Sequence, residues 1–388
     1  MHETVDDRAA HLRTKLVDDL LRSGVLRDSR WSQAFREVDR HAFLPKFFRQ
    51  RTDGDWSPID SAHSEWLSLV YRDRVCVTQL NGHDGAWEQA LRDGAVSGVP
   101  TSSSSMPTIM AIMLEALRVR QSHRVLEIGT GTGYNAALLS HALGDDQVTT
   151  IDVDPDVLRR AQALLAAAGY HPTCVAGDGA LGYPDRAPYD RVLCTCAVSR
   201  IPVAWLEQTV PGGLVVTTLN RTIGAGLVRI VADGAGSGEG RVLVEDGRFM
   251  PLRAHTQSWS ATLLEQARTA RTTDHRATGL PASAVVDPGS PFEFFAGLAL
   301  ADVVVGHGPR GRVHLAHPDG SWVRLHAREG GTEVEQGGPR QLWDLTEDAY
   351  RQWRDLDQPR RERFGITVTP TAQHLWLDRP DSGLTWPL

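Results

Sequence analysis

Apolar residues recur every three or four positions along two stretches of the first fifty residues. This spacing predicts helices over 8–26 and 31–48. Residues 51–100 are rich in Gly, Asp and Ser, so we expect irregular structure there, apart from a strand over 75–80. The chain is therefore expected to begin with a helical region followed by loops.

From residue 107 to about 219, helical periodicity alternates with short apolar runs. An apolar stripe marks a helix at 109–117, and Asp154-Pro155 is a typical helix start. Alternation of this kind predicts an α/β fold, with a parallel sheet covered by helices on both faces. The expected strands are 124–128, 148–152, 173–176, 191–196 and 214–220, the expected helices 134–143, 155–168 and 202–210, and a closing hairpin joins 227–231 to 241–244.

The pattern changes again after about residue 255. Pro318-Asp319-Gly320 lies between alternating apolar residues and indicates a hairpin, and 342–356 is expected to be a helix. We expect an α+β domain here. The expected domains are thus a helical N-terminal region with substrate-side loops (1–100), a central core (101–254) and a C-terminal tryptophan-rich domain for substrate recognition (255–388).

Tryptophan is concentrated in this last region. Its aromatic side chains could grip a peptide, but a small appended domain needs bulky residues for burial, so a core role is expected. The six tryptophans concerned are Trp259, Trp322, Trp343, Trp353, Trp376 and Trp386.

Composition limits the classes of function. The 388 residues are 41% hydrophobic and 23% charged, as in an ordinary globular protein with room for more than one domain. The net charge of −7 argues against nucleic acid as the main partner. No apolar run approaches the ~20 residues of a membrane span, and the first thirty residues lack a signal-peptide centre. We therefore expect no membrane association and a cytoplasmic location.

The segment Val125–Tyr134 carries the most specific signal. An apolar strand containing Glu127 runs into three alternating glycines, Gly129, Gly131 and Gly133, at the start of a helix. Glycine permits positive φ and close approach of a nucleotide-like cofactor to the backbone. The G-x-G-x-G spacing after an acid differs from the G-x-G-x-x-G of dinucleotide enzymes, and it indicates S-adenosylmethionine.

Acidic residues follow the next two expected strands. Asp152 ends the second strand, where it can bind ribose hydroxyls, and Gly177-Asp178-Gly179 follows the third, where Asp178 can accept from an adenine amino group. Both aspartates could instead be turn or helix-cap residues. The expected cofactor contacts are Glu127, Gly129, Thr130, Gly131, Gly133, Tyr134, Asp152, Val153, Asp178 and Gly179.

Cys194 and Cys196 lie two apart on an expected strand and share one face of it. A zinc site needs two further ligands at matching spacing, which the sequence does not offer. Buried free thiols and no bound metal are therefore expected.

Several segments resemble the protein-L-isoaspartate O-methyltransferase family. The resemblance covers about residues 30–220 and implies a Rossmann-like class I methyltransferase that uses S-adenosylmethionine. Its motifs are Ser105–Leu117, Val125–Tyr134, Gly177–Pro184 and Ala187–Arg191, and Ala34–Pro45 is similar to that family's first helix and the following turn.

The resemblance places the family's substrate-side serine at Ser105, with Ser104 and Thr108 beside it. Ser105 precedes a helix expected to start at Pro107, where backbone N–H groups favour a carboxylate. It could also be an ordinary N-cap, and the serine run could be a flexible linker. The family's Ala-Pro-His after the serine is replaced here by Met106-Pro107-Thr108, which puts recognition of a free isoaspartyl residue in doubt.

The serine run and the tryptophan-rich tail resemble a divergent branch found with gene clusters for ribosomally made, modified peptides such as graspetides and lanthipeptides. The residues after about 255 are expected to have no counterpart in the repair enzymes. The branch implies methylation of an aspartate in a cyclised precursor peptide, whose ester collapses to an aspartimide. A general repair methyltransferase, and a non-catalytic peptide-binding module on this fold, remain alternatives.

Overall fold

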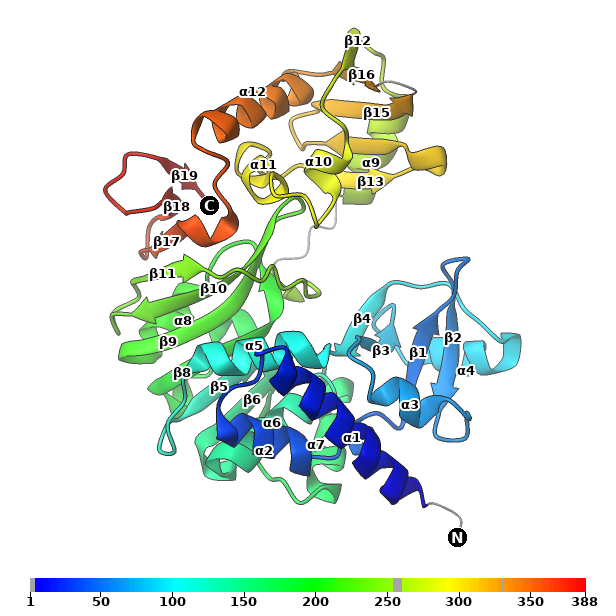
Figure 1. Cartoon of the computed structure of the whole chain (residues 1–388), viewed down its shortest axis with the longest axis vertical. Helices are drawn as coiled ribbons and strands as arrows, with labels where there is room; N and C mark the ends of the chain where they lie inside the picture. The colour runs from blue at the N-terminus through cyan, green and yellow to red at the C-terminus, as the bar shows by residue number, and fades with distance from the viewer. Residues whose placement is uncertain (1–3, 254–259, 329–330) are drawn as a thin grey trace. The chain divides into compact units, whose positions relative to one another are not determined.

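The computed structural model describes residues 4–253, 260–328 and 331–388. They form two compact units. The N-terminal unit comprises residues up to 196, 202–217 and 231–236; the C-terminal unit comprises 197–201, 218–230 and 237–388. The three-domain division expected from the sequence stays a prediction. Figure 1 follows the chain through its elements.

Two helices open the N-terminal unit, α1 (Val5–Arg22) and α2 (Ser29–Glu37). The expected helix over 31–48 is only half correct. After α2 the chain forms a 3-10 turn, η1 (Arg40–Phe43), and then strand β1 (Lys46–Gln50). Helix α2 ends earlier, at an extended Val38, and Pro45 prevents a helix from continuing through the last residues of the expected range, because proline disfavours helical φ/ψ in the residue before it and cannot donate a helical hydrogen bond.

Contrary to expectation, the region 51–100 contains regular secondary structure. Strands β1, β2 (Trp56–Asp60), β3 (Cys76–Leu80) and β4 (Pro100–Ser104) form an antiparallel sheet in the order β2-β1-β3-β4, accompanied by helices α3 (Trp66–Val70) and α4 (Gly85–Asp93). The serine run is therefore mostly strand, with Ser103 opposite Val77 and Ser104 opposite Cys76, and not a flexible linker.

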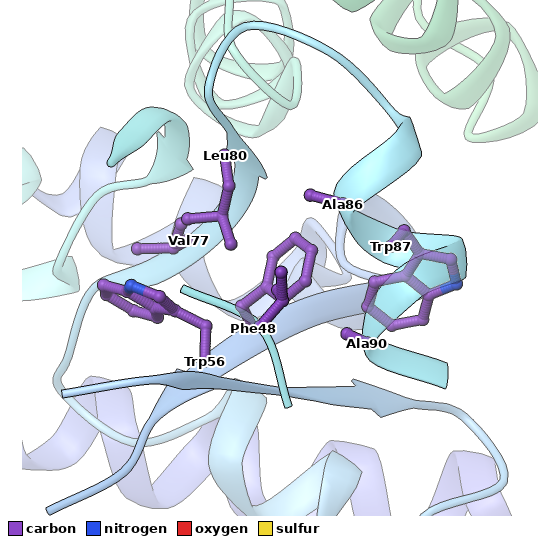
Figure 2. Close-up of a cluster of buried hydrophobic side chains, with 8 residues drawn as sticks. Phe48, Trp56, Val77, Leu80, Ala86, Trp87 and Ala90 are labelled. Atoms are coloured by element: carbon purple, nitrogen blue, oxygen red, sulfur yellow. The ribbon is translucent and has the colours of Figure 1, made fainter. Parts of the chain in front are cut away.

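A hydrophobic cluster holds α4 on this sheet (Figure 2). The Phe48 ring of β1 meets the Trp87 ring of α4 edge-on at a centroid distance of 5.3 Å. Trp56, Val77 and Leu80 complete the cluster from β2 and β3. The apolar residues of this segment thus bury one face of a small sheet. In the sequence they occur in short runs separated by Gly and Asp, so the strands are not evident from the pattern.

The α/β prediction for the centre of the chain is confirmed. Strands β8, β5, β6 and β7 are parallel neighbours, and β9 lies beside β8. The strands are β5 (Val125–Ile128), β6 (Val148–Asp152), β7 (Thr173–Ala176), β8 (Tyr189–Val198) and β9 (Thr209–Asn220); the helices are α5 (Pro107–Leu117), α6 (Tyr134–Leu143), α7 (Pro155–Ala167) and α8 (Val203–Glu207).

Apolar burial stabilises this core. All four residues of β5 are buried, as parallel strands covered on both faces require. Helix α6 packs on β6, α7 packs on β6 and β7, and α2 packs on α5 and α6. Loops follow the strands at their carboxyl ends, and this is the edge at which open parallel sheets bind their ligands.

The C-terminal unit contains an antiparallel five-stranded sheet in the order β12-β16-β15-β14-β13, with α9 packed on β13, β14 and β15. The expected hairpin around Pro318-Asp319-Gly320 is confirmed, with Leu315 opposite Val323. The elements are α9 (Ser260–Thr269), β12 (Asp274–Thr278), α10 (Ser283–Val286), α11 (Glu293–Ala299), β13 (Val304–His307), β14 (Val313–Ala316), β15 (Trp322–Arg328), β16 (Gly331–Gly337) and α12 (Leu342–Asp355).

The closing hairpin expected after β9 is also present. It consists of β10 (Ala225–Ala232) and β11 (Gly238–Val242), and β17 (Phe364–Val368), β18 (Gln373–Leu377) and β19 (Thr385–Pro387) continue from β11 as antiparallel strands.

The core role expected for the C-terminal tryptophans is confirmed for four of them. Trp322, Trp343, Trp353 and Trp376 are buried. Trp386 is half-buried and packs its ring on Phe295 and Phe364. Trp259 lies outside the described residues. Within the part of the chain that the structure describes, no helix combines the length and apolarity needed to cross a membrane.

Candidate functional site

The glycine loop after β5 is a bare backbone surface. Gly129, Gly131 and Gly133 all have positive φ, at 95°, 54° and 85°. A Cβ on Gly129 would lie 2.7 Å from the Thr195 hydroxyl oxygen, and one on Gly131 would lie 3.2 Å from the Ser103 carbonyl oxygen. The loop thus requires glycine for its conformation and for its close neighbours.

Hydrogen bonds bring the three predicted cofactor segments together at the strand ends. The Gly129 N–H donates to the Ile151 carbonyl at 2.9 Å, and the Gly131 N–H donates to the Asp152 carboxylate at 3.0 Å. The Gly177 N–H in turn donates to the Asp152 carbonyl at 3.0 Å. The loop, the acid after β6 and the Gly-Asp-Gly after β7 therefore form one continuous rim.

Both predicted acids also have local structural roles. The second oxygen of Asp152 accepts from the Asp154 N–H at 3.0 Å, and Asp178 accepts from the Ala180 N–H at 2.9 Å as the cap of a 3-10 turn, η3 (Gly179–Leu181). Asp178 is exposed, and Val153 is 40% exposed. The turn and cap alternative is therefore realised for both acids.

Glu127 is fully buried beneath the loop. Its carboxylate accepts from the Asn135 amide and the Thr150 hydroxyl, each at 2.6 Å, and Thr150 is 2.7 Å from the Thr130 hydroxyl. Burial raises the pKa of Glu127 to about 7, against the opposing effect of these two hydrogen bonds. With both oxygens occupied, Glu127 positions the loop from inside the core.

The side chain of Tyr134 lies away from the rim. Its ring is buried, with centroids 6.3 Å from Phe35 and 5.8 Å from Phe43. Burial raises the pKa of Tyr134 well above the usual value for a phenol. A cofactor contact from this residue is therefore left to its backbone at the start of α6.

The serine strand β4 passes over the glycine loop. The Ser103 carbonyl is the neighbour that a Cβ on Gly131 would meet, and Ser104 is 4% exposed. Gln79 of β3 ties the same region to the core, since its amide donates to Asp154 at 3.2 Å and accepts from the Thr101 hydroxyl at 2.8 Å. The structure thus brings the predicted substrate side and cofactor side together.

The start of α5 differs from expectation. The N-cap is Met106, without a side-chain hydrogen bond, so Ser105 does not serve as an ordinary N-cap. Asp73, from a loop 35 residues earlier in the sequence, caps the start of α5 instead. Its carboxylate accepts from the Thr108 N–H at 2.8 Å and from the Thr108 hydroxyl at 2.6 Å. Thr108 is therefore paired with Asp73, a residue that sequence reasoning missed.

Arg40 is a second residue that sequence reasoning missed. Its guanidinium is completely buried and donates to the carbonyls of Val70, at 2.8 Å, and Ser105, at 3.0 Å. Further bonds reach the carbonyls of Arg72 and Arg74, both at 3.2 Å. In the sequence Arg40 directly precedes His41-Ala42-Phe43-Leu44-Pro45, and no local pattern there indicates its distant carbonyl partners.

Both cysteines of β8 are free thiols; Cys194 is buried as expected, whereas Cys196 is only partly buried. Cys194 donates to the Cys196 carbonyl at a sulfur–oxygen distance of 3.4 Å. The hydrogen bond with Cys194 and burial hold the pKa of the Cys196 thiol above its usual range. Across residues 4–253, 260–328 and 331–388, no group of three or more His, Cys, Asp or Glu side chains is arranged for a metal ion.

These features fit S-adenosylmethionine. The glycine backbone can receive the methionine portion, Asp152 the ribose and the exposed Val153 and Asp178 the adenine. The fit depends on glycine, because a Cβ on Gly129 or Gly131 would need space that Thr195 and Ser103 already occupy.

Comparison with known proteins agrees with this site. A family model described as protein-L-isoaspartate(D-aspartate) O-methyltransferase matches residues 84–257. The chain is 40% identical over 152 residues to the protein-L-isoaspartate O-methyltransferase of Anaeromyxobacter dehalogenans, covering 38% of this chain and 71% of that one. It is 37% identical over 191 residues to the enzyme of Azorhizobium caulinodans, covering 48% and 83%.

A solved protein-L-isoaspartate O-methyltransferase shares the fold, with a TM-score of 0.53 at 23% identity. The alignment covers 95% of this chain and all of that one, so it extends beyond residue 255. The expectation that the C-terminal region has no counterpart in such enzymes is therefore wrong. These relatives do not support a non-catalytic module either. The chain belongs to the protein-L-isoaspartate O-methyltransferase family of S-adenosylmethionine-dependent carboxyl methyltransferases.

Proposed function

We propose that this enzyme methylates the free carboxylate of isoaspartyl residues in proteins or peptides. The observation that carries the proposal is the meeting of the serine strand and the glycine loop at Ser103 and Gly131, within a chain of this family. The family's own substrate is thus the first one to test.

When bound, S-adenosylmethionine supplies an electrophilic methyl group. A carboxylate is already ionised near pH 7, so the protein has no need of a strong general base. The chain contributes alignment and exclusion of water instead. Because Asp73 already occupies the Thr108 N–H, we expect the substrate carboxylate to rely on Ser105 more than on the helix N-terminus, while the buried Ser104 supports the strand.

Arg40 would fix the position of Ser105. Its hydrogen bond to the Ser105 carbonyl spans 65 residues of sequence and leaves the Ser105 hydroxyl to the substrate side. Since a misplacement of about 1 Å can cost about 100-fold in rate, holding this carbonyl is a direct contribution to alignment.

A second candidate substrate is an aspartate side chain in a cyclised precursor peptide, whose methyl ester would close to an aspartimide with loss of methanol. Its support is the Thr108–Asp73 pair, which stands where the family resemblance places histidine. A threonine bound to a carboxylate presents neither the charge nor the reach of an imidazole, so the substrate could differ.

One experiment compares the two. The enzyme and S-adenosylmethionine are incubated with an isoaspartyl peptide, its aspartyl isomer and a side-chain-cyclised peptide, and products are followed by mass spectrometry. The proposal expects a mass gain of one methylene on the isoaspartyl peptide alone. A gain confined to the cyclised peptide, followed by loss of methanol, would support the second candidate and overturn the first.

The role of Ser105 can be tested against a serine control on helix α2. Ser105→Ala should lower turnover and leave cofactor affinity, measured by calorimetry with S-adenosylhomocysteine, nearly unchanged. Ser32→Ala removes an exposed hydroxyl that donates only to the Ser29 carbonyl within α2 and should alter neither quantity. Equal losses of turnover and cofactor affinity in Ser105→Ala would assign Ser105 to folding.

A further inference from the structure

A cavity of about 700 Å³ lies in the C-terminal unit between helix α9 and the five-stranded sheet. Figure 1 labels α9 beside β13 and β15 in this unit. Six cationic or basic side chains line it, from α9 and from the strands and turn opposite: Arg268, His307, Arg312, His314, Arg324 and His326.

Two glutamates only partly offset this charge. Arg324 pairs with Glu335 at 2.6 Å and also donates to the Arg268 carbonyl at 3.0 Å, near the end of α9. Arg268 pairs with Glu265 at 3.3 Å. The guanidinium of Arg312 is exposed and has no partner among the residues that the structure describes. The cavity therefore keeps one uncompensated positive charge even with every histidine neutral.

Three nitrogens of these side chains are buried without a hydrogen bond: Nδ1 of His314, Nε of Arg324 and Nε2 of His326. Nε2 of His326 is 3.9 Å from the Glu335 carboxylate oxygen Oε1, which is too far for a hydrogen bond. Burial, reinforced by Arg268 and Arg324, lowers the pKa of His314. Buried polar groups normally have partners, and Nε of Arg324 can only donate, so this site favours a ligand that brings acceptor oxygens.

Glycine keeps the cavity open. A Cβ on Gly308 would lie 3.2 Å from Nε2 of His314, and one on Gly306 would lie 2.9 Å from the Leu264 side chain. The φ of Gly308 is −107°, which any residue can adopt. Glycine at this position is therefore required because it has no Cβ to fill the cavity, and not because of its backbone conformation.

We propose that this cavity binds side-chain carboxylates of an acidic peptide segment, so that the C-terminal unit holds the substrate through residues other than the one methylated. The proposal rests on the proposed function, which makes the substrate a protein or peptide. The volume favours a segment over a single small anion, since it is within the ~300–1,000 Å³ of sites that enclose sizeable ligands. Ala261 and Leu264 add an apolar wall for its aliphatic carbons.

The first test uses a capped peptide of alternating glutamate and alanine as the probe, titrated calorimetrically into the full chain. Its glutamine counterpart is the control. The glutamate peptide should bind, more weakly as ionic strength rises from about 0.01 to about 0.1 M, and the glutamine peptide should not. Equal binding of both peptides, or displacement by inorganic phosphate at concentrations where acetate has no effect, would overturn the proposal.

Substitutions then locate the site. Arg312→Gln should weaken binding of the glutamate peptide about fivefold or more. Gly308→Ala, which narrows the cavity without changing its charge, should also weaken it. Arg351→Gln is the matched control, because it removes an equal charge from an exposed pair with Asp348 on α12. If Arg351→Gln weakens binding as much as Arg312→Gln, the attraction is not specific to the cavity.

Activity separates this inference from the proposed function. Saturating the wild-type enzyme with the glutamate peptide should leave its methylation of a short isoaspartyl peptide that lacks other acids unchanged, because the probe occupies the cavity and not the methylation site. If the wild-type enzyme fails to methylate any isoaspartyl peptide yet binds the glutamate probe, the proposed function fails while the binding site remains.

Discussion

Glu127 should make the enzyme less stable as pH rises from about 4.5 to about 7. Its pKa is about 7 in the folded protein against 4.5 for an exposed glutamate. Between these values the folded state holds a proton that the unfolded state has lost, so the free energy of unfolding falls as pH rises, until both states are ionised above about 7. At about 1.4 kcal/mol per pKa unit, the full effect is about 3 kcal/mol.

Glu127→Gln isolates this contribution. The amide can accept from Asn135 and donate to Thr150, so the local hydrogen bonds are kept without a titrating group. Between pH 5 and pH 8, the free energy of unfolding of the variant, measured by urea denaturation, should fall by about 2–3 kcal/mol less than that of the wild type.

The control is Glu88→Gln, an exposed glutamate on α4, which should leave the pH dependence of the wild type unchanged. Parallel stability curves for the wild type and Glu127→Gln would refute the reasoning, because they would mean that Glu127 titrates alike in the folded and unfolded states.

Three further predictions concern the site. Arg40→Met leaves four backbone carbonyls without their donor and should cost about 3 kcal/mol in urea denaturation. A double-mutant cycle of Asp73→Asn and Thr108→Val should give a coupling energy of about 1 kcal/mol, while additive losses would show that the pair does not interact. Gly129→Ala should abolish calorimetric binding of S-adenosylhomocysteine, whereas Gly212→Ala, with φ of 79° and nothing within 4 Å, should not.

The sequence was sufficient for the parts of the fold that are governed by local periodicity. Buried parallel strands such as β5 are short continuous apolar runs, and Asp154-Pro155 starts a helix through its own side chain and ring. Both signals act within a few residues. The rim of Gly129, Asp152 and Asp178 was accessible for the same reason, since each residue simply follows a strand.

The parts that the sequence did not reveal depend on distant partners. Strand β1 lies within the helix expected over 31–48, and its pairing with β2 and β3 is what makes it a strand. Asp73 reaches Thr108 across 35 residues and Arg40 reaches Ser105 across 65. No local pattern reports such contacts.

The double position of strand β4 has a thermodynamic consequence. It pairs with β3 in the small sheet, and its Ser103 carbonyl is next to Gly131 of the cofactor loop. Gln79 joins the same sheet to Asp154. A ligand that orders the loop must therefore also slow the opening of this sheet, and by reciprocity whatever loosens the sheet must weaken the ligand. Amide hydrogen exchange in β3 and β4 should consequently slow when S-adenosylhomocysteine binds, although neither strand contains a predicted cofactor contact.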